Sequence, residues 1–277
     1  MAGLLMGGPS RDTLAALQAR FAVLTDRAEQ ADIGRIAEEL EAVTSLLSRE
    51  PALRRHLVDW SVSGEARRGL ARTFLGGRVS AEVRELVEAA VGGRWSRPGD
   101  LTDAIELLSR LAVFAVAERD GSLDEVEDEL FRFGRILAGQ PRLRTLLADP
   151  AATPERRIGL LDSVLGDKVV AVTARLLRQT VAAPRGRNLE DAVAGLSELA
   201  ATRRERYLAH VRTAQPLTAA QEQHLSTTLT RIYGRPISLQ IEIDDAVLGG
   251  LVVRVGEEII DGSVAGRLAA VRHRFAG

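Results

Sequence analysis

Apolar residues in the first third of the chain recur with the spacing of amphipathic helices. They stand at Leu14, Leu17, Phe21 and Leu24, and again at Ile33, Ile36, Leu40, Val43 and Leu47. Apolar residues three and four positions apart form one stripe on a helix, which buries against a core. Pro51, Ser63 and Ser80 then mark three further helix starts, since proline suits the first helical turn and serine can cap it. The pattern predicts a bundle of helices over residues 1–97.

Residues 141–166 repeat residues 51–76 at a separation of 90 positions, with 11 of 26 residues identical. The identical pairs include Pro51 with Pro141, Arg67 with Arg157, and Gly76 with Gly166. This period is too long for stacked repeats of one or two helices, so we interpret it as duplication of a whole bundle. A second copy is therefore expected over 98–206, where Ser122 and Glu125 have the spacing of a capping box.

From Tyr207 onward the spacing changes from helical to alternating. Residues 207–213 are expected to form a strand, after which Thr218 and Gln221 form a capping box that opens a helix. The apolar residues Ile237, Leu239, Ile241 and Ile243 then alternate with polar ones, as in a sheet with one buried face. Residues 207–277 are thus expected to form a small mixed sheet with helices on one side. The predicted fold class is mainly α, with two tandem duplicated helical bundles followed by this small α+β domain.

Residues 248–263 combine glycine turns with two apolar runs that are too short for helices. Gly249 and Gly250 permit a sharp entry into a strand, and Gly256 starts a hairpin turn into a second strand. Ser263 then stands where it can cap a last helix.

The same stretch resembles a known family. The order Gly-Gly-Leu-Val-Val-Arg-Val-Gly, followed by Ile-Asp-Gly-Ser-Val and a Gly-Arg-Leu helix, is similar to the C-terminal signature of the delta subunit of F-type ATP synthase. This family includes the mitochondrial oligomycin-sensitivity-conferring protein. The motif positions are Gly249, Gly250, Arg254, Gly256, Asp261, Gly262, Ser263, Gly266 and Arg267. The resemblance covers 101–277 directly, and residues 1–97 are linked to it only through the internal repeat. Most family members have one bundle, so the first copy in this chain departs from the usual domain organisation of the family.

The resemblance implies a stator subunit without catalytic activity or a cofactor. Such a subunit links the catalytic head to the peripheral stalk, so that the head resists the torque of the rotor. Relatives bind the N-terminal helix of the alpha subunit on their helical bundle and the end of the b-subunit stalk on their C-terminal domain. We expect the second copy to keep the head contact, because residues 112–118 and 121–126 carry the better resemblance. The residues expected to line that groove are Ile105, Leu108, Ala112, Ala115, Val172 and Leu176.

The charge pattern and the residues that could carry chemistry give little support to nucleic-acid binding, a metal site or catalysis. The 37 basic and 38 acidic residues are interspersed, which argues against a nucleic-acid footprint. There is no cysteine, and the four histidines lack the spacing of a helical metal site. Asp244 and Asp245 precede a glycine turn and are interpreted as turn formers rather than a catalytic pair. The alternative is a helical adaptor whose C-terminal domain binds RNA like a KH fold, which needs a Gly-x-x-Gly clamp and a basic face that this sequence does not clearly offer. An enzyme is the third hypothesis, after the stator subunit and the RNA-binding adaptor.

The expected location follows from two features of the sequence. No apolar run is long enough to span a bilayer, and residues 1–10 lack the pattern of a secretory signal. Together with the resemblance, this predicts a peripheral protein at the cytoplasmic face of the bacterial plasma membrane, held there through its partner subunits.

Overall fold

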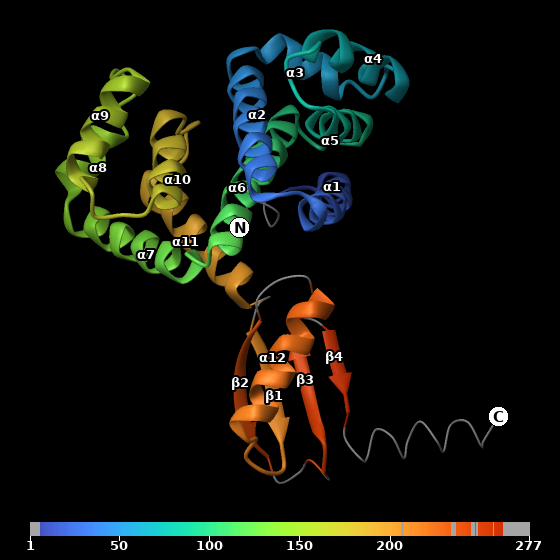
Figure 1. The fold of residues 1–277 in the computed structure, drawn as a ribbon. Helices are drawn as coiled ribbons and strands as arrows, with labels where there is room; N and C mark the ends of the chain where they lie inside the picture. The colour runs from blue at the N-terminus through green and yellow to red at the C-terminus, as the bar shows by residue number, and fades with distance from the viewer. Residues whose placement is uncertain are drawn as a thin grey trace. The chain divides into compact units, whose positions relative to one another are not determined.

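The computed structural model describes residues 6–205, 208–233, 237–244, 247, 249–256 and 258–262. The chain divides into two compact units, Met1–Glu198 and Leu199–Gly277 (Figure 1). The first unit is helical, and the second holds a small sheet with a helix. This confirms the predicted fold class, mainly α with a small α+β domain at the C-terminal end.

The helices of the first unit repeat at the predicted interval. The first copy consists of α1 (Gly8–Arg27), α2 (Gln30–Arg49), α3 (Pro51–Val58), α4 (Gly64–Leu75) and α5 (Ala81–Gly92). The second copy consists of α6 (Pro98–Asp120), α7 (Leu123–Gly139), α8 (Pro141–Leu147), α9 (Pro154–Leu165) and α10 (Ala171–Ala182), and α11 (Leu189–Glu205) follows. The buried stripe of α2, Ile33, Ile36, Leu40, Val43 and Leu47, recurs in α7 as Leu123, Val126, Leu130, Phe133 and Leu137. The duplication recognised in one segment therefore extends over five helices.

Most of the predicted helix caps form, and one does not. Ser63 and Ser80 accept hydrogen bonds from the backbone N–H groups of Ala66 and Val83, at 3.2 and 3.4 Å. The capping box predicted at Ser122 was wrong, because the Ser122 hydroxyl donates to the carboxylate of Asp120 at 2.6 Å instead. A nearby acceptor thus competes with the helix for this serine.

Helix α6 packs against helices of both copies. It contacts α1, α2, α3 and α5 as well as α7 and α10. Its residues Leu101, Ile105 and Leu108 are buried, and α11 has a buried stripe with the same spacing at Leu189, Val193 and Leu196. Helix α6 is therefore both the sixth helix of the first bundle and the first helix of the second, which explains why 14 of its 23 residues are buried. The predicted boundary after residue 97 falls just before this shared helix. The division into domains 1–97 and 98–206 stays a prediction.

The second unit is built on a four-stranded mixed sheet in the order β2-β1-β3-β4. Its elements are β1 (Leu208–Thr213), α12 (Ala219–Tyr233), β2 (Ser238–Ile243), β3 (Leu251–Val255) and β4 (Glu258–Asp261). Strand β1 runs parallel to β2 and antiparallel to β3, and Val211 pairs with both Ile241 and Val253. The core cluster contains Ala209, Val211, Leu229, Ile237, Val253 and Val255. It joins one face of the sheet to α12, as the sequence pattern predicts (Figure 1).

The capping box and the glycine turns predicted for this unit are both present. The Thr218 N–H donates to Gln221 Oε1 at 2.8 Å, and the Gln221 N–H donates back to Thr218 Oγ1 at 3.3 Å, which is a complete capping box. Gly249, Gly250 and Gly256 adopt positive φ angles of 70, 79 and 58°, which glycine reaches without a steric penalty. The motif residues Arg254 and Asp261 are exposed on β3 and β4, and Gly262 donates its N–H to the backbone oxygen of Leu251 at 3.0 Å. Ser263, Gly266 and Arg267, together with the predicted last helix, lie outside the described residues.

Candidate functional site: an open groove on the first bundle

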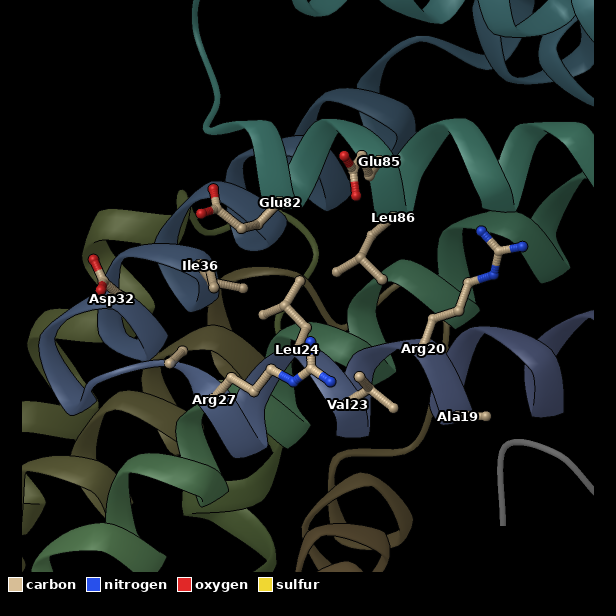
Figure 2. Close-up of a pocket in the computed structure, with 11 residues that line it drawn as sticks. Ala19, Arg20, Val23, Leu24, Arg27, Asp32, Ile36, Glu82, Glu85 and Leu86 are labelled. Atoms are coloured by element: carbon tan, nitrogen blue, oxygen red, sulfur yellow. The ribbon is translucent and has the colours of Figure 1, made fainter.

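A groove with an apolar floor lies between α1 and α5 (Figure 2). Leu24, Ile36 and Leu86 meet at its floor, where the cavity has a volume of about 770 Å³. Val23 lies on the α1 side, and 54% of its side chain is exposed. An apolar hollow between two helices can receive the apolar side chains of a further helix.

A second hollow of about 640 Å³ continues the groove along the same two helices, and it shares Arg20 and Glu85 with the first. The residues Ala16, Ala19, Ala89 and Gly92 line the two hollows, and their small side chains keep the space between the helices open. The groove therefore follows most of α5, whose 12 residues extend about 18 Å. That length suits three turns of a further helix.

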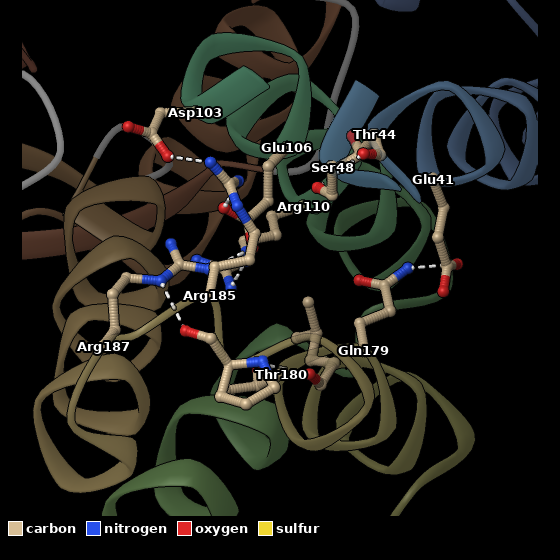
Figure 3. A network of polar contacts seen from close by, with 12 residues as sticks. Glu41, Thr44, Ser48, Asp103, Glu106, Arg110, Gln179, Thr180, Arg185 and Arg187 are labelled. Carbon is tan, nitrogen blue, oxygen red and sulfur yellow. Dashed lines mark hydrogen bonds and ion pairs between the residues drawn. The ribbon is translucent and has the colours of Figure 1, made fainter. Parts of the chain in front are cut away.

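The corresponding surface of the second bundle lies between α6 and α10, and helix α2 covers it. The Ser109 hydroxyl of α6 donates to the backbone oxygen of Ala37 in α2 at 3.0 Å. Gln179 of α10 donates to the carboxylate of Glu41 in α2 at 2.6 Å (Figure 3). Val113, which stands 90 positions after Val23, is only 2% exposed. The chain's own helix therefore occupies the second groove and leaves the first one open.

The residues predicted from the sequence to line a partner groove are all buried. Ile105, Leu108, Ala112, Ala115, Val172 and Leu176 are between 0 and 8% exposed. They belong to α6 and α10, beside the surface that α2 covers. Their contact with a partner stays a prediction, and it would require α2 to move away.

Sequence reasoning did not find the open groove. Val23, Glu82 and Glu85 line it, and a signal for them exists in the repeat. At the positions equivalent to Glu82 and Glu85, the second copy has Val172 and Arg175. A stripe with charged residues on its border indicates a surface, whereas a helix that is apolar on all sides indicates a core.

A buried ionic network closes one end of the second bundle (Figure 3). The Glu106 carboxylate pairs with Arg110 at 2.9 Å, Arg185 at 2.8 Å and Arg187 at 2.5 Å. Arg185 also pairs with Asp103 at 2.6 Å. Burial alone would raise the pKa of Glu106, but the guanidinium groups of Arg110, Arg187 and Arg185 hold that pKa below its ordinary value. The network fixes the connection between α10 and α11 against α6, and the sequence gives no local signal for it.

The described residues form neither a metal cluster nor a helix that could span a membrane. In that part of the chain, no three side chains of metal-binding type come together to hold an ion. No described helix combines the length and the apolar character needed to cross a bilayer.

The duplicated bundles, the open groove of helix length and the small sheet domain define a mainly helical scaffold with an open groove on its first bundle. The family model described as ATP synthase delta (OSCP) subunit matches residues 110–275, which is more than half of the chain. The chain belongs to this family.

Relatives extend the similarity to the first bundle. The ATP synthase subunit delta of Streptomyces griseus is 47% identical over 272 residues, which cover 98% of this chain and 100% of that protein. The subunit delta of Thermobifida fusca is 43% identical, with 98% and 100% covered. The ATP synthase subunit b-delta of a Mycobacterium species is 45% identical over 97% of this chain and 60% of its own length. A chain of the Toxoplasma gondii mitochondrial ATP synthase hexamer is 19% identical over 61% of this chain and 95% of its own, with a TM-score of 0.33. The delta relatives therefore share the first bundle, which the family model does not cover.

Proposed function

We propose that the protein is a stator subunit of an F-type proton-translocating ATP synthase that ties the catalytic head to the peripheral stalk. The family and the names of the relatives support a place in that complex. The observation that carries the proposal is the open groove between α1 and α5. A joint under continuous torque needs a partner that dissociates slowly, and a helix buried in a groove on a rigid bundle meets that need.

The head contact is proposed for the first bundle, where the groove takes the N-terminal helix of the alpha subunit. The second bundle supports this, because its equivalent groove already accommodates a helix, α2. The sequence alone favours the second bundle for this contact, but there the surface is filled by α2. With Val23 exposed and Leu24 half-buried beside it, the first groove offers apolar area that an incoming helix would remove from water.

The C-terminal domain, residues 207–277, is proposed to hold the b-subunit stalk. The name of the b-delta relative, in which this chain corresponds to 60% of the length, supports an association between b and delta. The described part of the sheet offers apolar side chains for such a contact, since Ile243 on β2 and Ile259 on β4 are 57% and 65% exposed.

The location follows from these partners. We infer a peripheral protein at the cytoplasmic face of the bacterial plasma membrane, held through the head and the stalk. Washing membranes with high salt or a chelator should release it. If only detergent releases the protein, the peripheral assignment fails.

The groove is tested with Val23→Glu in the full chain. The substitution places a charge beside the apolar floor at an exposed position, so it should weaken binding of an alpha-subunit N-terminal peptide at least tenfold in calorimetric titration while the fold is retained. Val62→Glu is the matched control, because Val62 is 38% exposed and does not line the groove. Equal affinities for the Val23→Glu variant and the wild type would overturn the proposed head contact.

A further inference from the structure

The two sides of the open groove carry opposite charges. Arg20 and Arg27 stand on the α1 side, and Glu82 and Glu85 stand on the α5 side (Figure 2). All four side chains are exposed, and none makes an ion pair or a side-chain hydrogen bond with another described residue. Around the first hollow, four unpaired charges therefore stand in two rows of opposite sign beside the apolar floor. Asp32 of α2, which also lines this hollow, pairs with Arg35 at 2.9 Å, and the acidic Asp12 lies farther along α1 at the second hollow.

The occupied groove of the second bundle shows how such charges are used. Arg175 of α10 stands at the position equivalent to Glu85, with the opposite charge. It lies 3.7 Å from the carboxylate of Glu38 and 3.9 Å from that of Glu41, both on α2. Where a helix fills the groove in this molecule, the charge on the α10 side therefore meets the opposite charge on the occupant.

We propose that the rows of opposite charge make the open groove directional. It accepts an amphipathic helix that has basic residues along one edge of its apolar stripe and acidic residues along the other. The basic edge lies against Glu82 and Glu85, and the acidic edge lies against Arg20 and Arg27. Turning the helix end for end exchanges its two edges and places like charges together, which disfavours the reversed direction. This inference rests on the proposed function of the groove and adds the charge pattern and direction of its partner.

The affinity test uses two model peptides of about 18 residues with the same apolar stripe. One has lysine along one edge and glutamate along the other, and the second has lysine along both edges. The full chain should bind the first peptide roughly fivefold tighter at low salt, and the difference should disappear at about 1 M salt. If neither peptide binds, the groove itself and the proposed head contact fail. If both bind equally at low salt, the groove stands and the charge inference fails.

The direction test places a nitroxide label at the N-terminus of the first peptide. Broadening of backbone amide signals should be confined to one end of α5 in the wild-type chain. The variant R20E/R27E/E82R/E85R exchanges the two rows without changing the net charge, and all four positions are exposed. In this variant the broadening should move to the other end of α5. Broadening at both ends of the wild type, or at the same end in both proteins, would overturn the inference.

Discussion

Glu106 is a residue on which the second bundle depends. Its carboxylate, 10% exposed, pairs with three guanidinium groups, and one of them, Arg110, is itself only 13% exposed. Removing one partner from a buried ionic group leaves the other charges without compensation, and this typically costs about 3–5 kcal/mol. The network therefore depends on pH through the Glu106 carboxyl group, which pairs with three of its arginines.

We predict that Glu106→Gln lowers the free energy of unfolding by about 3 kcal/mol near neutral pH. Because the pKa of Glu106 is lower in the folded protein than in the unfolded one, its contribution is complete above the unfolded pKa of about 4.3. The contribution is lost as the pH falls below that value toward the folded pKa. Urea unfolding from neutral to acidic pH should show the gap between variant and wild type narrowing.

Glu125→Gln is the control for this prediction, because Glu125 is exposed and makes no ion pair among the described residues. Its stability difference from the wild type should be small and similar at each pH. A gap between Glu106→Gln and wild type that stays constant down to about pH 3 would contradict the role given to the carboxylate.

At the scale of elements, the shared helix α6 couples the two bundles. Leu108 is completely buried in a helix that contacts α2 as well as α10. A mutation in α6 should therefore weaken the first bundle, although the repeat assigns α6 to the second.

We predict that Leu108→Ala destabilises the first bundle by about 2–5 kcal/mol, the usual cost of a buried leucine-to-alanine change. Trp95 reports on this bundle, since its indole N–H donates to the Ala90 oxygen at 2.8 Å. With Trp60 replaced by Phe, Trp95 is the only tryptophan, because the sequence has two. The thermal midpoint from Trp95 fluorescence should fall together with the midpoint from circular dichroism. An unchanged Trp95 transition would show that α6 belongs energetically to the second bundle alone.

Much of each element could be predicted from the sequence because the signals are local. The stripe from Ile33 to Leu47 fixes the buried face of α2, and the Thr218–Gln221 capping box fixes the start of α12. The box at Ser122 was predicted wrongly because Asp120, two residues earlier, offers a competing acceptor. The repeat was visible only in the segment with eleven identities, but it extends over five helices because the buried positions kept their apolar character rather than their identity.

At the scale of the whole molecule, the groove residues could not be predicted from the same local signals. Ile105 and Leu108 have helical spacing, which suits a core and a binding groove equally well. The contacts that separate the two roles join α2 to α6 and α10, and Gln179 and Glu41 in one of them are 138 positions apart. The sequence does distinguish the open surface from the covered one at equivalent positions, where Glu82 and Glu85 of the first copy correspond to Val172 and Arg175 of the second. This difference can be interpreted only after the two grooves are aligned through the repeat.

The central claim is that the first bundle offers an open groove while α2 fills its counterpart in the second. Hydrogen exchange of the full chain, with and without the alpha-subunit N-terminal peptide, tests this claim most directly. The peptide should slow exchange along α1 and α5 and leave α6 and α10 unchanged, because α2 already covers them. Slower exchange in α6 and α10, together with faster exchange in α2 because the peptide displaces it from the second groove, would contradict the claim. That result would support binding of the head by the second bundle.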